Sequence, residues 1–140
     1  MAGKPSAVIV DIDGTLALIA DRNPYSHHGV LKNQPNHAVI AVARALAAQG
    51  HTLVVVSGRS ELARADTELW LTRHLGAEFE GPLMRAESDQ RKDATIKREI
   101  FRREIEPRFD ILCVLDDRDQ VVSMWRSLGF TCLQVAPGDF

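Results

Sequence analysis

Residues Val8 to Ala17 read VIVDIDGTLA, and they place Asp11 and Asp13 directly after an apolar run. A run of this kind, rich in β-branched residues, is typical of a strand at the centre of a sheet. The Gly-Thr pair that follows the second carboxylate favours a turn, and Asp beside Gly is most often only a turn residue. The pair therefore indicates a chemical site only if other parts of the chain bring further polar groups to the same place.

The rest of the chain alternates short apolar runs with longer segments of helical periodicity. The predicted strands are AVIVD (7–11), TLVVVS (52–57), PLMRA (82–86), ILCVLDD (111–117) and TCLQVA (131–136). Four of them are almost continuously apolar, as in strands that are covered on both faces. The predicted helices are 36–49, about 62–75, 93–105 and 118–128. This order predicts an α/β fold, a doubly wound, Rossmann-like parallel sheet with helices on both faces and no large cap domain.

The apolar positions of the helical segments predict which faces are buried. Asn36 stands at the N-cap position of the first helix. Trp70 and Trp125 lie among apolar residues at helical spacing, so we expect core packing rather than base stacking. The face of the first helix that we expect to be buried consists of Val39, Val42, Ala43 and Leu46.

Length and composition limit the classes of protein that fit. A chain of 140 residues predicts a single domain over residues 1–140, with an N-terminal tail at 1–6 and a small loop insert at about 14–35. The net charge of -2 excludes a broad cationic surface that coats duplex nucleic acid. Cys113 and Cys132 lie in apolar runs and are expected in the core. With no leader and no apolar run near the roughly 18 residues of a membrane span, we expect a cytoplasmic protein that contacts no membrane.

Polar residues gather where the predicted strands end. Asp11 ends the first strand, Ser57, Gly58 and Arg59 end the second, and the pair Asp116-Asp117 ends the fourth. In an open parallel sheet, ligands bind beyond these carboxyl ends. Several carboxylates at one edge repel each other unless a cation balances them, and carboxylate oxygens suit Mg2+. The residues therefore predict a Mg2+ site that receives a phosphate group.

A lysine from the third helical segment is expected to reach that phosphate. Asp93 and Lys97 are one helical turn apart, so the carboxylate could hold the lysine in place. Lys92 is the rival, and spacing alone leaves the choice open. The adjacent His27 and His28 point apart in an extended loop and lack a third ligand, so we interpret them as surface residues.

The motifs DIDGT, VVVSGR, a lysine and LDD resemble the four motifs of haloacid-dehalogenase (HAD) superfamily phosphatases. The resemblance implies that Asp11 is a nucleophile that forms an aspartyl-phosphate. It also implies that Asp13 is first a general acid and then a general base, a pair of roles that suits a turn able to aim both carboxylates.

Nearly the whole chain is similar to the 3′-phosphatase domain of bacteriophage polynucleotide kinase/phosphatase. The matching stretches are DIDGTLA, RNPY, VVVSGR, RKDATIKREIF, PRFD, DDRDQVVSMWRSLGF and GDF. The similarity selects Lys97 over Lys92 and implies a polynucleotide 3′-phosphatase active in nucleic-acid repair. The catalytic residues that it implies are Asp11, Asp13, Ser57 and Lys97. The substrate-binding residues that it implies are Thr15, Arg22, Gly58, Arg59 and Asp93. The Mg2+ ligands that it implies are Asp11, the Asp13 backbone carbonyl, Asp116 and Asp117.

One departure from that family affects the expected partners. The chain has no GxxxxGK[ST] loop, so it lacks the kinase half and should not phosphorylate 5′ ends. We expect either a stand-alone phosphatase or a domain excised from a longer protein. The substrate implied is a nucleic-acid 3′ end, DNA or RNA, with 2′,3′-cyclic ends and the oligomeric state left open, and the partner implied is a separate kinase or ligase.

Two alternatives share part of the pattern. A small-molecule phosphatase of the same superfamily, acting on a sugar or nucleotide phosphate, would carry every catalytic motif. A phospho-Asp receiver module would place its paired acids after the first strand, whereas here they follow the fourth. The presence of Asp13 also favours turnover over a lasting switch.

Overall fold

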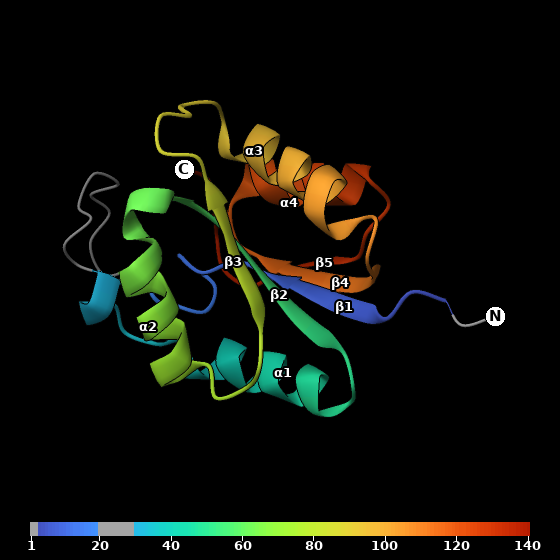
Figure 1. The fold of residues 1–140 in the computed structure, drawn as a ribbon, viewed down its shortest axis with the longest axis horizontal. Helices are drawn as coiled ribbons and strands as arrows, with labels where there is room; N and C mark the ends of the chain where they lie inside the picture. The colour runs from blue at the N-terminus through green and yellow to red at the C-terminus, as the bar shows by residue number, and fades with distance from the viewer. Residues whose placement is uncertain (1–2, 20–29) are drawn as a thin grey trace.

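The computed structural model describes residues 3–19 and 30–140, and these form one parallel sheet between two helical layers (Figure 1). The described residues contribute five strands, in the spatial order β3-β2-β1-β4-β5. The strands are β1 (Ser6–Val10), β2 (Thr52–Ser60), β3 (Glu80–Arg85), β4 (Asp110–Asp116) and β5 (Cys132–Gln134), and all four pairings are parallel. The predicted α/β doubly wound sheet is confirmed.

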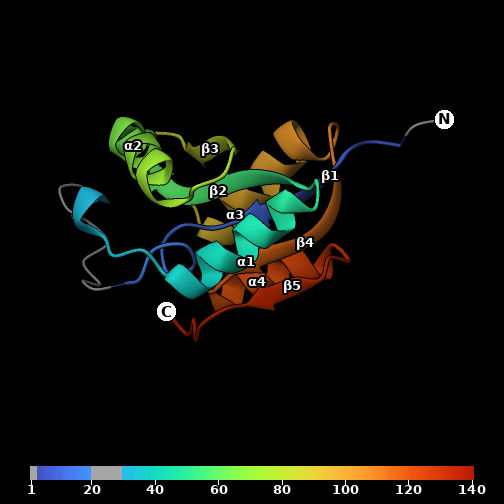
Figure 2. The ribbon, with the colours of Figure 1, turned by 90° about the horizontal axis from the view of Figure 1, so that it is seen from below.

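Helices cover both faces of this sheet. They are α1 (His37–Ala48), α2 (Arg64–His74), α3 (Asp93–Ile100) and α4 (Asp119–Ser127). Figure 2, which looks from below, shows α1 across the near face of the strands, while α3 and α4 lie beyond the sheet. The segment predicted as one helix over 93–105 is α3 followed by a π-helical turn at Phe101–Ile105.

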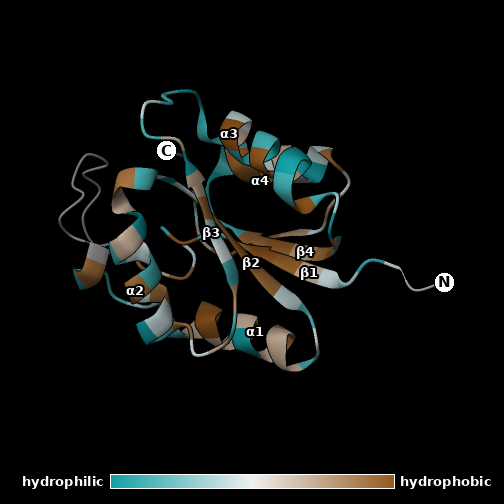
Figure 3. Ribbon diagram, in the orientation of Figure 1, coloured by the Kyte–Doolittle hydropathy of each residue, from teal (hydrophilic) through white to brown (hydrophobic). Residues whose placement is uncertain are grey.

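Two hydrophobic clusters fill the space between the sheet and its helical layers. One joins α1 and α2 to alternate residues of β1 and β2, and it contains Trp70. The other joins α3 and α4 to the remaining alternate residues, and it contains Trp125. Figure 3 shows the central strands as the most hydrophobic part of the ribbon. Both tryptophans have no exposed surface, and Cys113 and Cys132 are free thiols in the core, so these predictions are confirmed.

The structure corrects some local predictions. Val42 is 46% exposed, and Ile40 takes its place on the buried face of α1 because the helix is rotated by part of a turn from the predicted face. Asn36 stands at the N-cap but makes no side-chain capping hydrogen bond. Strand β1 ends at Val10, so Asp11 lies just beyond it, while β2 continues to Ser60 through the SGR motif.

Some sequence features lie outside the described part of the chain. Much of the predicted insert at about 14–35, including Arg22, His27 and His28, falls there. Within residues 3–19 and 30–140, none of the helices is both long enough and apolar enough to cross a bilayer.

Candidate active site

The topology brings the carboxylates of β1 and β4 together. These strands are neighbours although about 100 residues separate them, and Val10 pairs with Leu115. The Asp11 amide continues the ladder by donating to the Leu115 carbonyl at 3.0 Å. Asp116 ends β4, and its neighbour Asp117 follows directly. This is the point where the strand order reverses, which is where open α/β sheets bind their ligands.

Three buried carboxylates meet at this point. Asp11, Asp116 and Asp117 are 6%, 1% and 2% exposed, and each offers one oxygen such that the three atoms lie within 4.8 Å of one another. Thr15, which has no exposed surface, donates its hydroxyl to Asp11 Oδ2 at 3.0 Å, with Asp117 Oδ1 at 3.4 Å as a second acceptor. The Thr15 hydroxyl is therefore a hydrogen-bond donor to two carboxylates of the cluster.

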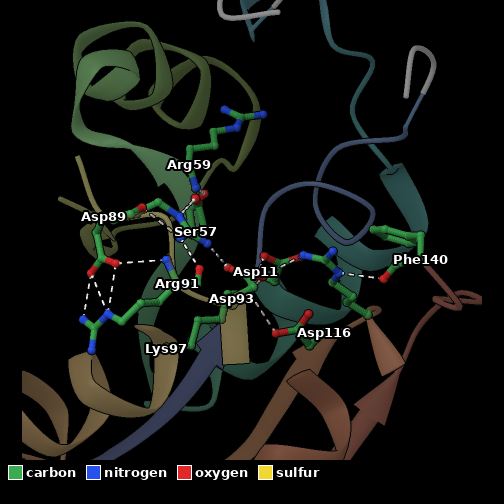
Figure 4. Close-up of polar contacts among 12 residues, drawn as sticks. Asp11, Ser57, Arg59, Asp89, Arg91, Asp93, Lys97, Asp116 and Phe140 are labelled. Atoms are coloured by element: carbon green, nitrogen blue, oxygen red, sulfur yellow. Dashed lines mark hydrogen bonds and ion pairs between the residues drawn. The ribbon is translucent and has the colours of Figure 1, made fainter. Parts of the chain in front are cut away.

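Lys97 supplies the positive charge inside the cluster (Figure 4). It reaches in from α3 and is 1% exposed. Its ammonium donates to Asp11 Oδ1 at 2.8 Å and to Asp116 Oδ2 at 3.1 Å. Asp93 Oδ2 is farther from it, at 3.8 Å, so the helical-turn neighbour holds the lysine less closely than the two strand-end carboxylates do. Lys92 is exposed at the N-cap of α3, so the structure places Lys97 and not its rival in the site.

Burial and like charge perturb the titration of these groups. Burial, together with the nearby Asp116 charge, raises the pKa of Asp11 well above its ordinary value, although Lys97 opposes the rise. Burial also raises the pKa of Asp117. For Lys97, burial alone would lower the pKa, but the charges of Asp11 and Asp116 raise it well above the ordinary value. Three carboxylates facing one ammonium leave an excess of buried negative charge.

The donor set fits a hard divalent cation. Asp117 Oδ2 is buried and has no hydrogen-bond partner among the described residues, an arrangement that is costly unless another group binds that oxygen. The turn after β1 also brings the backbone close to it, since a Cβ on Gly14 would lie 2.0 Å from Asp117 Oδ2. Gly14 has φ +83°, a conformation that glycine adopts without strain. Carboxylate oxygens in this number are the ligands that Mg2+ prefers.

Asp13 lies apart from the buried cluster and is paired with Arg59. Its side chain is 49% exposed. Arg59 donates from Nε to Oδ2 at 2.8 Å and from Nη2 to Oδ1 at 2.6 Å, so both carboxylate oxygens are held in a fork. Arg59 Nη1 also donates to the Thr67 hydroxyl at 3.2 Å. Asp13 forms an isolated bridge with Ala17, and its carbonyl remains a proposed metal ligand.

The end of β2 lies beside the end of β1, because the two strands pair in parallel. Ser57 is 1% exposed, and its hydroxyl accepts from the Arg59 amide at 3.1 Å. A Cβ on Gly58 would lie 2.0 Å from Asp93 Oδ1, so the backbone at this position approaches the carboxylate as closely as only glycine allows. The structure thus brings Asp11, Thr15, Lys97, Asp116 and Asp117 into one buried cluster, while Asp13 pairs with Arg59 beside it.

Arg85 and Trp125 make contacts in the site that were not expected from the sequence. Arg85, at the end of β3, donates from Nε to the Gly58 carbonyl at 2.9 Å, and Asp93 Oδ1 lies 3.4 Å from its Nη2. Arg85 could have been predicted as a site residue, because it lies in the run PLMRA at the end of a strand that leads to the same edge of the sheet. Trp125 donates its indole N-H to Asp116 Oδ2 at 3.2 Å, and nothing in its apolar surroundings indicated this.

Comparisons with known proteins match nearly the whole chain to one family of domains. The family model of the polynucleotide kinase PNKP phosphatase domain matches residues 5–140. A protein of Autographa californica nuclear polyhedrosis virus, named bifunctional polynucleotide kinase/RNA ligase, is 32% identical over 126 residues, which are 89% of this chain and 18% of the relative. This chain therefore spans less than a fifth of that relative.

Solved structures are similar over the whole chain. One chain of a Pnkp1/Rnl/Hen1 complex is 39% identical with a TM-score of 0.93, and the match covers 100% of this chain and 49% of that one. A second, from a Pnkp1/Rnl/Hen1 RNA repair complex, is 40% identical with a TM-score of 0.92 and coverages of 98% and 44%. A class C acid phosphatase from Bacillus anthracis with tungstate bound is 16% identical with a TM-score of 0.62, over 99% of this chain and 68% of that one, and shares the fold.

Proposed function

Since the chain belongs to the family of polynucleotide kinase PNKP phosphatase domains, we propose that it is a Mg2+-dependent 3′-phosphatase of nucleic-acid ends. The observation that carries the proposal is the buried Asp11 carboxylate, held by Lys97 at 2.8 Å beside two further buried aspartates. A nucleophile needs such a fixed position, and the adjacent cationic group favours approach of a phosphate dianion.

Mg2+ would be held by Asp11, Asp116, Asp117 and the Asp13 backbone carbonyl. The buried Asp117 Oδ2, which has no hydrogen-bond partner in the part of the chain that the structure describes, supports this assignment. When bound, the cation would neutralise the excess negative charge of the carboxylates and of the incoming phosphate.

In the first step, an Asp11 carboxylate oxygen attacks phosphorus, and the bond from phosphorus to the ribose 3′ oxygen breaks. Asp13 donates a proton to the departing oxygen, because an alkoxide leaves poorly. Arg59 donates to both Asp13 oxygens in the structure, so the side chain that should protonate the leaving oxygen is engaged by the guanidinium. We therefore propose that the substrate phosphate draws Arg59 away and frees Asp13 to carry its proton.

In the second step, water attacks the aspartyl-phosphate on Asp11 and releases inorganic phosphate. Asp13, now ionised, accepts the proton of that water. Ser57 and Lys97 would contact the phosphate oxygens with their side chains. The backbone of Gly58 and Arg59 would lie next to the same phosphate. The Thr15 hydroxyl, which donates to Asp11, would orient the nucleophile. Asp93, which lies near Lys97 and Gly58, would hold the lysine and the end of β2 in position.

The proposed substrate class is a polymer end in RNA repair, as the relative from an RNA repair complex supports. Arg22, assigned from the sequence similarity alone, would grip the phosphate next to the scissile one. Residues 1–140 would act as a single phosphatase domain in the cytoplasm, working with a kinase or ligase that carries out the other steps of end repair.

The test compares substrates. Rates on a 3′-phosphorylated oligonucleotide and on a panel of sugar and nucleotide phosphate monoesters are measured with Mg2+ and with excess chelator, and Asp11→Asn is the inactive control. We expect the oligonucleotide to give the highest kcat/KM and chelator to abolish turnover. Preference for a small monoester would replace the polymer substrate with the small-molecule alternative, and full activity in chelator would contradict the metal assignment.

A further inference from the structure

Trp125 does more in the structure than fill the core. It has no exposed surface, and its ring lies among aromatic neighbours, with centroids 6.0 Å from Phe101 and 6.4 Å from Phe130. Packing in this cluster requires an apolar ring but no polar atom, because the side chains of the two neighbours have none. The indole N-H instead donates to Asp116 Oδ2 at 3.2 Å, so the cluster presents one donor to the site.

The donors around Asp116 leave it little freedom. Oδ2 accepts from Lys97 at 3.1 Å and from Trp125, and Oδ1 accepts from the Asp117 amide at 2.9 Å. A carboxylate has about four lone-pair sites, so these three donors leave about one for a further ligand. Asp116 is thus presented to the site in one orientation. Asp117 differs, since its Oδ2 has no partner among the described residues.

We propose that Trp125 is a positioning residue for the metal site, in that its indole N-H fixes the rotation of the Asp116 carboxylate and thereby sets the affinity for Mg2+. The inference rests on the proposed function, because it needs Asp116 to be a metal ligand. The contact comes from helix α4, and Trp125 lies nine residues further along the chain than Asp116. Removing a hydrogen-bond partner of a metal ligand typically costs about 10- to 100-fold in metal affinity.

Trp70 offers a matched control within the same chain. It also has no exposed surface, and its indole N-H donates to the Asn33 carbonyl at 2.9 Å. It belongs to the hydrophobic cluster on the opposite face of the sheet. Trp70→Phe and Trp125→Phe therefore remove the same groups from equally buried positions, and only the second touches Asp116.

The experiment titrates each folded variant with Mg2+ by isothermal calorimetry and measures kcat at saturating Mg2+, with unfolding temperatures as the check on structure. We expect Trp125→Phe to bind Mg2+ about tenfold or more weakly and to recover most of its kcat when the site is saturated. Trp70→Phe should stay within about twofold of the wild type in Mg2+ affinity, because its partner, the Asn33 carbonyl, is not among the proposed metal ligands.

Outcomes that overturn the proposal are distinct from failure of the function itself. Unchanged Mg2+ affinity in folded Trp125→Phe, or equal losses in both variants, would make Trp125 a packing residue only. If Trp125→Phe does not fold, 3-benzothienylalanine at position 125 keeps the bicyclic ring, removes only the N-H donor, and is judged by the same criterion. Hydrolysis of a 3′-phosphorylated oligonucleotide by the wild type with Mg2+ tests the proposed function separately.

Discussion

Lys97 partly compensates the negative charge of the carboxylates at the sheet edge. It is buried between Asp11 and Asp116, and each of these carboxylates accepts a hydrogen bond from its ammonium. One ammonium cannot balance every carboxylate of the cluster, which is why burial and Asp116 still raise the pKa of Asp11. Without a bound cation, Asp11 is therefore more easily protonated when the chain is folded than when it is unfolded.

This raised pKa predicts a pH-dependent effect of Asp11→Asn on stability without metal. A carboxyl group whose pKa is raised on folding adds stability below its ordinary pKa, here 3.8, and loses that contribution as the pH rises through the folded value. The variant lacks this titration, so the unfolding temperature of the variant minus that of the wild type should increase with pH above 3.8. Thermal unfolding in chelator across the pH range measures it. A constant difference would mean that folding leaves the pKa of Asp11 unchanged.

The pair Asp13 and Arg59 predicts a separation of the two chemical steps. Asp13→Asn should lower turnover of a 3′-phosphorylated oligonucleotide by about 100- to 10,000-fold, because the leaving oxygen needs a proton. p-Nitrophenolate needs none, so the variant should release a burst approaching one per enzyme and then slow. Rapid-mixing absorbance measures this. Equal, mild losses on both substrates without a burst would leave Asp13 as a turn residue bound to Arg59.

At the scale of elements, the turn after β1 packs against the end of β4. Gly14 makes this possible, since its backbone passes against Asp117. Gly50, just after α1, shares the unusual backbone conformation, with φ +100°, but a Cβ at that position would meet no atom of the described residues within 4 Å. Both glycines therefore have a positive φ, but only Gly14 lies against a side chain of the site.

Replacing each glycine by alanine should separate backbone strain from damage to the site. Gly50→Ala should cost about 1–2 kcal/mol of unfolding free energy, the cost of the left-handed conformation, and spare kcat. Gly14→Ala adds a clash with Asp117 and should lose most activity together with Mg2+ binding. Denaturant unfolding and calorimetric Mg2+ titration measure both. Normal Mg2+ binding in Gly14→Ala would show that the turn is free to move away from Asp117.

For the whole molecule, the charge balance limits how nucleic acid is bound. With a net charge of -2, the chain is suited to holding a strand end by a few residues rather than along a cationic surface. Arg22 is the one residue that we propose for a phosphate other than the scissile group.

The salt dependence should therefore be shallow. Each single-strand phosphate contact contributes a slope of about −0.7 to the plot of log affinity against log salt, so one or two contacts predict a slope of about −1. Oligonucleotides of increasing length should share this slope, and steady-state kinetics at several salt concentrations measure it. A slope of about −5, growing with length, would indicate an extended binding surface that the proposal lacks.

The sequence was sufficient for features that depend on near neighbours. The alternation of apolar runs and helical periods predicted the order of strands and helices, because burial on two faces requires those patterns locally. The motifs at the strand ends predicted Asp11, Ser57, Asp116 and Asp117 as one site, since parallel strands present their carboxyl ends at one edge. Helix faces were predicted less accurately, as Val42 and Ile40 illustrate.

The contacts that define the site were decided by tertiary structure alone. Lys97 contacts Asp11 although 86 residues separate them in the sequence, and Arg59 contacts Asp13 across 46 residues. Spacing in the sequence predicts neither contact. Both depend on which strands become neighbours and on how α3 packs against the sheet. The hydrogen bond from Trp125 to Asp116 has the same origin, because an apolar helix face predicts burial but not the direction of an indole N-H. Packing of distant elements therefore supplied the partners, charges and orientations on which the proposed chemistry depends.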